Sequence, residues 1–182
     1  MAKRYDEIDD RLRDWLLAQP VFFVATAPLA GDGHVNVSPK GMDGTFAVLG
    51  ARRVGYLDYY GSGIETMAHL RENGRIVIMM CAFDGAPKIV RLHGRGYTLR
   101  PGEDGFAALR ARFPKRRDKG VRSIVIVDLD RISDSCGFAV PTMQHVADRD
   151  VLDVSQLRRE DAYFVQYGAT HNAESIDGLR GL

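Results

Sequence analysis

Short apolar runs rich in β-branched residues recur through the first two thirds of the chain, and turn dipeptides separate them. Runs of this length and pattern predict β-strands, and Asp-Gly between two of them is a strong hairpin signal, found at Asp43-Gly44 and Asp84-Gly85. Closely spaced strands joined by hairpins favour an antiparallel barrel or sandwich over a doubly wound sheet. The expected strands cover residues 21–26, 34–38, 45–49, 53–59, 75–83, 88–99 and 122–129.

Three helices with defined bounds are expected around these strands, and a further amphipathic helix is expected directly after the Gly61-Ser62-Gly63 turn. Apolar residues with helical spacing predict a first helix over about residues 6–18, and a short helix is expected over about residues 103–112. A third helix is expected over about residues 153–167, opened by a capping box between Asp153 and Gln156. The tail after this helix carries three aliphatic residues in a short stretch, and disorder goes with low hydrophobicity. We therefore expect the tail to pack on the body of the protein.

Composition narrows the class of protein. The chain has 182 residues, enough for one domain (1–182), with 45% apolar and 27% charged residues, as in ordinary soluble proteins. A net charge of +1 gives no electrostatic reason to expect nucleic acid or an acidic membrane as partner. Only Cys81 and Cys136 occur, without a CxxC pattern, which fits a reducing cytoplasm. No run approaches the roughly 20 apolar residues of a membrane span, and the N-terminal segment lacks the apolar stretch of a signal peptide.

The first candidate site is the turn Gly61-Ser62-Gly63, where a predicted strand runs into a predicted helix. Free backbone amides, the hydroxyls of Ser62 and Thr66, and the positive end of a helix dipole suit an anion such as a phosphate. A second interpretation competes with this one, because Ser62-Gly63-Ile64-Glu65 also fits a capping box that would occupy the same donors.

A second candidate is the segment that ends in Ser38-Pro39-Lys40. Strand alternation sends Val37 to one face and the polar Ser38 to the other, and Pro39 interrupts the ladder before the cation of Lys40. Such a strand is either a solvated edge or one face of a ligand site.

Two further charged residues lie within predicted strands. Asp58 shares a strand face with apolar residues, so it needs a partner if it is buried; the partner is either the following turn or a ligand. Arg91 lies with His93 and Arg95 on one face of its strand, which is a phosphate site, a subunit boundary or an exposed face. None of the five histidines has the spacing of a zinc site, and no G-x-S-x-G motif supports a hydrolase, so no metal is expected.

Taken in order, these motifs resemble those of the pyridoxamine 5'-phosphate oxidase-like, FMN-binding split-barrel proteins over roughly residues 15–135. The resemblance rests on Val37-Ser38-Pro39-Lys40-Gly41, Tyr56-Leu57-Asp58, Gly61-Ser62-Gly63-Ile64-Glu65-Thr66, Leu70-Arg71-Glu72-Asn73-Gly74-Arg75 and Arg91-Leu92-His93-Gly94. It implies a mainly β (α+β) fold, a six-stranded antiparallel split β-barrel with flanking helices. It also implies a homodimer with FMN at the subunit interface and a small-molecule substrate.

The resemblance also implies roles for individual residues. Val37, Ser38, Pro39 and Lys40 would run along the flavin ring, with Lys40 as the cation. Ser62, Gly63 and Thr66 would meet the phosphate, while Asp58 and Arg91 complete the candidate set. Related oxidases carry Arg and Lys where this chain has Glu65 and Thr66, and the chain lacks their C-terminal Arg/His substrate signature.

The function expected from these features is that of an FMN-binding oxidoreductase whose substrate the sequence does not name. Two alternatives stay open on the same barrel. One is a deazaflavin-dependent reductase. The other is a flavin- or haem-binding protein without enzymatic activity, in which His93 or His145 would be an axial haem ligand.

Overall fold

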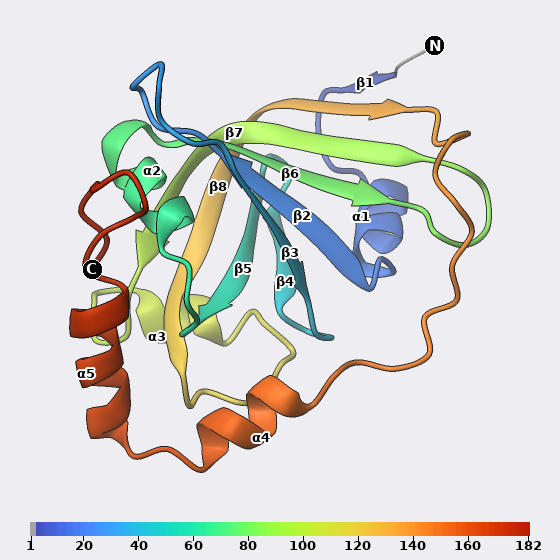
Figure 1. The fold of residues 1–182 in the computed structure, drawn as a ribbon. Helices are drawn as coiled ribbons and strands as arrows, with labels where there is room; N and C mark the ends of the chain where they lie inside the picture. The colour runs from blue at the N-terminus through green and yellow to red at the C-terminus, as the bar shows by residue number, and fades with distance from the viewer. Residues whose placement is uncertain (1–2) are drawn as a thin grey trace.

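A computed structural model describes residues 3–182 of the protein (Figure 1). Met1 and Ala2, which open the segment expected to lack a signal peptide, lie outside the described residues. The seven strands expected from sequence are present as β2 to β8, and a short β1 precedes them. The strands are β1 (Arg4–Tyr5), β2 (Val21–Thr26), β3 (Asn36–Gly41), β4 (Phe46–Gly50), β5 (Arg53–Tyr59), β6 (Arg75–Cys81), β7 (Ile89–Leu99) and β8 (Val121–Ser135); the helices are α1 (Asp10–Leu17), α2 (Glu65–Asn73), α3 (Phe106–Arg110), α4 (Val151–Leu157) and α5 (Asp161–His171).

The strands form one curled antiparallel sheet in the order β3-β2-β6-β7-β8-β5-β4, and β1 pairs with β8 (Figure 1). This confirms the mainly β split-barrel class, with seven strands along the path instead of the expected six. The edge strands β3 and β4 are consecutive in the chain, and only the turn 42–45 separates them. The five steps from Gly41 to Phe46 span at most about 18 Å even when fully extended, so the two edges of the sheet must approach each other there. That approach is what curls the sheet into a half-barrel.

The hairpin expected at Asp84-Gly85 is confirmed, because the whole of β6 pairs with residues 89–95 of β7. The hairpin expected at Asp43-Gly44 is wrong: β3 pairs with β2, and β4 pairs with β5. An Asp-Gly pair sets a tight turn, with Gly44 at φ +74°, but it does not choose the partners of the strands on either side. Here the turn joins two opposite edges of one sheet.

Apolar side chains fill the curled sheet on both of its faces. Inside the curl, side chains such as Val24, Ile78 and Leu92 are fully buried against the helix α1. On the outside, Ile124 and Ile126 pack with Phe113 in a second cluster. The Ile-Val-Ile-Val run of β8 is therefore buried on both faces, which explains why it shows no polar alternation.

Small residues recur at alternate positions of β7, and this pattern indicates that the backbone of a neighbouring strand approaches β7 closely on that face. A Cβ atom built on Gly94 would lie 2.1 Å from the carbonyl oxygen of Asp128 on β8. The pairing of β7 with β8 shifts register between His93 and Gly94. No side chain fits at this irregularity, so glycine is required by space and not by backbone conformation.

The helices depart from expectation mainly after β8. The first helix is confirmed as α1, and α3 is shorter than expected. The single helix expected over residues 153–167 is wrong, because α4 ends at Leu157 and α5 begins at Asp161. Asp153 lies inside α4 and makes no cap, since its carboxylate pairs with Lys115 at 2.6 Å. An ion pair with a distant loop replaces the local capping box.

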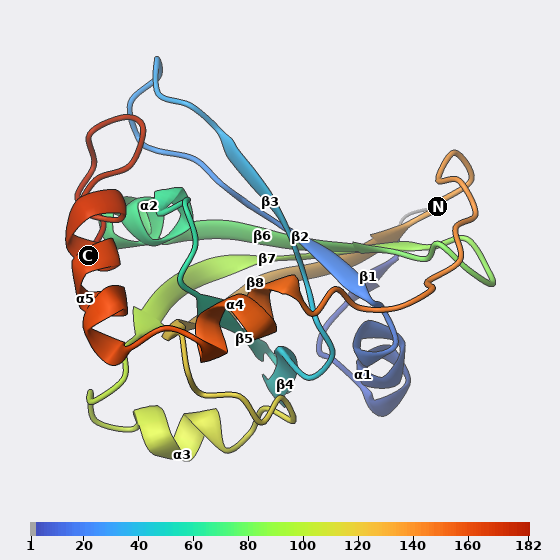
Figure 2. The same ribbon diagram turned by 60° about the horizontal axis from the view of Figure 1, so that its bottom comes forward.

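The chain after β8 runs back along the open side of the sheet to α4, turns into α5 and ends beside α2 (Figures 1 and 2). Asn172 is completely buried and Ser175 nearly so, which confirms that the tail packs on the body. Ile176 is nevertheless 71% exposed, so not every aliphatic residue of the tail contributes to this packing. None of the described helices is both long enough and apolar enough to cross a membrane.

Candidate functional site

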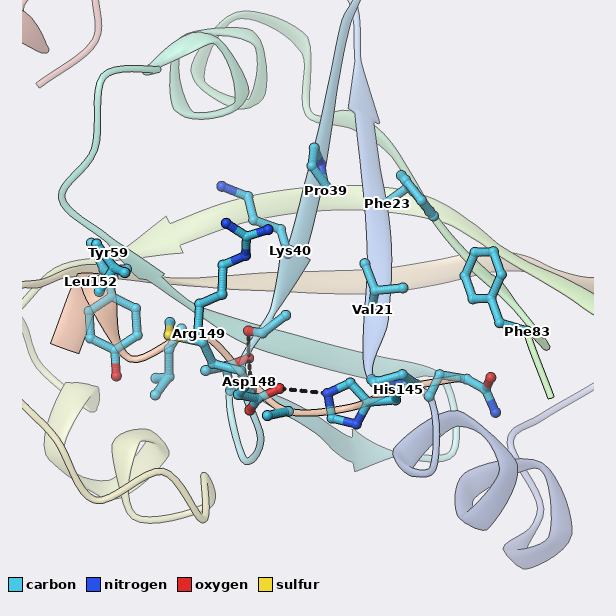
Figure 3. Close-up of a pocket in the computed structure, with 18 of the residues that line it drawn as sticks. Val21, Phe23, Pro39, Lys40, Tyr59, Phe83, His145, Asp148, Arg149 and Leu152 are labelled. Atoms are coloured by element: carbon cyan, nitrogen blue, oxygen red, sulfur yellow. Dashed lines mark hydrogen bonds and ion pairs between the residues drawn. The ribbon is translucent and has the colours of Figure 1, made fainter. Parts of the chain in front are cut away.

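A large cavity of about 1830 Å³ lies between the sheet and the chain that follows β8 (Figure 3). One wall comes from the strands β2, β3 and β5 with the loop after β5. The other wall comes from residues 142–155, which we call the strap. The strand and loop wall includes Val21, Phe23, Pro39, Lys40, Gly41, Leu57, Asp58, Tyr59, Tyr60 and Gly61, and the strap contributes Thr142, Met143, Gln144, His145, Ala147, Asp148, Arg149, Val151, Leu152 and Ser155.

Hydrogen bonds hold the first half of the strap against the body. The amide of Met143 donates to the carbonyl of Phe83 at 2.8 Å. The Asp148 carboxylate accepts from the amide of Asp43 at 2.7 Å and lies 3.1 Å from Nε2 of His145. The strap is thus tied to the β6–β7 loop and to the turn between β3 and β4, on two sides of the cavity.

Ion pairs hold the second half of the strap where α4 begins. Asp153 meets Lys115 at 2.6 Å and Arg117 at 2.8 Å, both from the loop before β8. One turn later, the buried Gln156 donates to the carbonyl of Tyr60 at 2.7 Å. These contacts join α4 to the loop before β8 and, through Gln156, to the loop after β5 that lines the cavity.

A largely buried network of charged side chains holds the strands that line the cavity. The Asp58 carboxylate accepts from Nε of Arg122 at 2.8 Å, and the ammonium group of Lys40 lies 3.7 Å from its other oxygen. Asp58 and Arg122 are almost fully buried, whereas Lys40 stays partly exposed beside the cavity. Two cations therefore share one carboxylate, and Arg122 is the nearer of the two.

The same network reaches the Gly61-Ser62-Gly63 loop. Arg122 donates to the carbonyl of Gly63 at 3.0 Å and to the Asn172 side chain at 2.9 Å. Asn172 in turn donates to the carbonyl of Gly61 at 3.0 Å. The partner of Asp58 within the chain is thus not the turn itself but an arginine that links the aspartate to the turn.

The capping box expected at Ser62 and Glu65 is wrong. The helix α2 starts at Glu65 with Ile64 as its N-cap, and no side chain caps it. Ser62 is exposed and lies three residues before the helix, and the carbonyls of Gly61 and Gly63 on either side of it accept from Asn172 and Arg122. The competing capping interpretation of these donors therefore does not apply.

A polar cluster lies between β3 and α2. Asn36 donates to Oγ1 of Thr66 at 3.0 Å and to Oγ1 of Thr26 at 3.3 Å, and Ser38 donates to Asn36 at 3.1 Å. Thr26 also lies 2.9 Å from Nδ1 of the fully buried His69. Burial lowers the pKa of His69, which favours its neutral form. The polar face of β3 thus serves packing against α2.

Of the remaining charged candidates, Arg91 and His93 do not line the cavity, whereas His145 does. Arg91 donates to Oγ of Ser135 on the neighbouring β8 at 2.9 Å and does not line the cavity. His93 is half-buried on the same face, and burial lowers its pKa. His145 does line the cavity, where it faces Asp148. The described residues contain no group of three or more potential metal ligands.

Comparison with known proteins decides the family. The family model described as "Pyridoxamine 5'-phosphate oxidase" matches residues 8–136. The chain belongs to this family. Across 98% of its length it is also 38% identical to the pyridoxamine 5'-phosphate oxidase family protein ustO of Aspergillus flavus, covering 77% of that protein.

Solved structures are similar to the chain at low sequence identity. A variant of HupZ from Group A Streptococcus is 19% identical, with a TM-score of 0.53 over 70% of this chain and 99% of that chain. A structure described as an FAD-binding protein from Mesorhizobium loti is 15% identical, with a TM-score of 0.49 over 74% of this chain and 96% of that chain. At these identities the likeness to HupZ concerns the fold alone.

The family's barrel brings only part of the sequence-predicted set together at the cavity. Pro39, Lys40 and Asp58 line it. Outside it, the side chain of Val37 is 62% exposed. The other predicted residues that are not among those lining the cavity are Ser38, Ser62, Gly63, Thr66 and Arg91, although Ser62 and Gly63 follow directly on the lining residue Gly61.

Sequence reasoning missed three contributors to the site: the strap, Arg122 and Asn172. Arg122 opens an apolar strand, and Asn172 follows a helix, so each carries only a weak local signal. The strap before α4 has no regular structure and no periodicity to mark it.

Proposed function

We propose that the protein binds FMN in this cavity and acts as a flavin-dependent oxidoreductase on a small molecule. The observation that carries the proposal is the meeting of Pro39, Lys40 and Asp58 with the loop after β5 around one cavity, on the barrel of the pyridoxamine 5'-phosphate oxidase family. The family relation supports the cofactor, and the cavity supports its place.

The residues at the cavity fit a flavin. Ligand pockets commonly measure about 300–1,000 Å³, so a cavity of about 1830 Å³ has room for a cofactor and a second molecule beside it. Val21, Phe23 and Leu57 offer apolar surface to a ring system, and Lys40 offers a positive charge to an anionic or electron-rich group. Amides of the Gly61–Gly63 loop remain the candidates for the phosphate.

A bound flavin would supply two-electron redox chemistry, and the protein's part would be to bind, orient and shield it. Pro39 and Lys40 would hold the ring, while Arg122 and Asn172 keep the loop after β5 in place through its carbonyls. The strap would exclude water from the side of the cavity opposite the strands.

A homodimer is part of the proposal. The edge strand β3 leaves Val37 62% exposed, and Val35 just before it is 70% exposed. Apolar side chains on an exposed edge strand favour burial against a second chain. Sedimentation at low micromolar concentration should give twice the mass of the chain; a stable monomer that retains flavin would contradict the dimer.

We also propose that the protein is cytoplasmic, which its two free cysteines, Cys81 and Cys136, support.

The decisive experiment is to bind FMN and riboflavin to wild type and to Lys40→Ala. Charge-assisted hydrogen bonds contribute about 1.5–3 kcal/mol, or roughly 10- to 150-fold in affinity. If Lys40 meets the phosphate, only FMN binding weakens; if it meets the ring, both ligands weaken equally. Lys3→Ala, an exposed lysine away from the cavity, is the matched control. A wild-type protein that binds no flavin, or whose visible spectrum is that of haem or a deazaflavin, would refute the proposal.

A further inference from the structure

Arg149 is a cation of the strap that has no partner among residues 3–182. It lines the cavity, and the described structure gives its guanidinium neither a hydrogen bond nor an ion pair. Figure 3 shows its side chain reaching from the strap toward the sheet, on the side of the cavity where Lys40 lies. Two cations thus border one space from opposite walls.

The acidic groups of the cavity are already occupied. Asp58 has Arg122 as its nearer partner, at 2.8 Å, compared with 3.7 Å to Lys40. Asp148 faces His145 and the amide of Asp43. Asp84 accepts from the amide of Gly85 in its own turn, at 2.7 Å. None of these carboxylates meets Arg149, so its positive charge is available to a ligand.

The backbone that carries Arg149 is fixed on both sides. Asp148, the residue before it, is anchored to the turn between β3 and β4, and Asp153, four residues after it, is anchored by Lys115 and Arg117. A guanidinium on a fixed backbone offers several donors in one plane, which suits the paired oxygens of a carboxylate or phosphate. The neighbouring strap residues Val151 and Leu152 add apolar surface to the same wall.

We propose that Arg149 is the specificity-determining residue for an oxyanion, a carboxylate or phosphate, on the apolar molecule that occupies the cavity beside the flavin. The proposal rests on the proposed function, because it assigns the second occupant of the same cavity. It also gives the strap a role: the barrel binds the cofactor, and the strap recognises the substrate. FMN also carries a phosphate that Arg149 could bind. The test therefore has to distinguish an oxyanion on the second molecule from the phosphate of FMN itself.

The test measures binding by calorimetry in wild type, Arg149→Met and Arg149→Lys, each with and without FMN. The probes are benzoate, its neutral analogue benzyl alcohol, and inorganic phosphate. Arg149→Met should weaken benzoate or phosphate binding roughly tenfold or more, leave benzyl alcohol unchanged, and leave FMN affinity unchanged. Arg149→Lys should restore part of the loss. Arg158→Met removes a charge from an exposed arginine outside the cavity and should change nothing.

The outcomes separate this proposal from the cofactor proposal. Oxyanion binding that is equal in wild type and Arg149→Met overturns the role of Arg149, whatever the flavin does. A loss of FMN affinity without a loss of riboflavin affinity moves Arg149 to the cofactor phosphate and also overturns it. If the wild type binds no flavin but binds benzoate through Arg149, the proposed function fails while the oxyanion site stands. Equal melting temperatures of the variants show that the fold is intact.

Discussion

Replacing Asn172 with alanine tests whether the tail stabilises the loop beside the cavity. Asn172 is completely buried, although only ten residues follow it in the chain. Its side chain donates to the carbonyl of Gly61 at 3.0 Å and accepts from Arg122 at 2.9 Å. Gly61 lines the cavity, and Arg122 holds Asp58. One side chain therefore connects the tail, the loop and the charged network.

The size of the effect follows from the groups that lose their partners. The carbonyl of Gly61 would lose its side-chain donor, at a cost of about 1–3 kcal/mol if it stays buried. Arg122 would lose one acceptor but keep Gly63 and Asp58, so its loss lies at the lower end of the about 1.5–3 kcal/mol for bonds to charged groups. Because neighbouring effects do not add fully, we expect the free energy of unfolding to fall by about 2–4 kcal/mol. For a protein of this size the melting temperature would fall by roughly 5–15 °C.

Calorimetric or fluorescence melts at one fixed protein concentration measure this change, since association would make the melting temperature depend on concentration. Glu174→Ala, an exposed change two residues further along the tail, is the matched control and should melt with the wild type. FMN should also dissociate faster from Asn172→Ala, because the loop at Gly61 loses its tether. A variant that melts with the wild type and releases flavin at the same rate would refute this reasoning.

Three further substitutions test other parts of the structure. Gly94→Ala would place a Cβ atom 2.1 Å from the Asp128 carbonyl, so urea unfolding should show a loss of about 1–3 kcal/mol or more, whereas Gly31→Ala, with open space around it, should show little. Burial lowers the pKa of His69 below its ordinary value of about 6.5, so the unfolded chain binds the proton more readily and wild-type stability should fall as the pH drops through about 6.5. The free energy of unfolding of His69→Gln, measured from about pH 7.5 to about pH 5.5, should show a shallower slope, and an unchanged slope would contradict this. Glu65→Gln removes a charge from the first turn of α2 but no capping box, so stability should change by less than about 1 kcal/mol, and a large loss of turnover with flavin still bound would reveal a chemical role.

Local pattern predicted the strands well, because each strand is a short sequence with its own signal. It failed where partners are distant. The turn at Asp43-Gly44 was expected to make a hairpin, and the structure instead uses it to join two edges of the sheet. Asp58 was correctly expected to need a partner, but that partner, Arg122, lies 64 residues away in the sequence.

Only the strand wall of the cavity could be predicted from the sequence, again because the position of the other wall depends on contacts between distant residues. The strand wall carries motifs, so Pro39, Lys40 and Asp58 were found from the sequence. The strap has no periodic pattern before α4, and it is positioned by contacts such as that between Asp43 and Asp148, 105 residues apart. Nothing in the local sequence distinguishes Arg149 from a solvated surface arginine; only the folded chain shows that it borders the cavity.

The boundary between the strand wall and the strap also coincides with the end of the region that the family model matches. The family model covers residues 8–136, which include every strand that lines the cavity, and it ends before the strap begins at residue 142. The alignment with the Aspergillus flavus relative covers 98% of the chain, and so includes the strap. A barrel that is common to many proteins can hold a common cofactor, whereas a segment outside it is free to differ between branches. Differences in substrate within the family should therefore follow the strap more closely than the strands, and exchanging residues 142–155 between two flavin-loaded relatives should transfer oxyanion preference without altering flavin affinity.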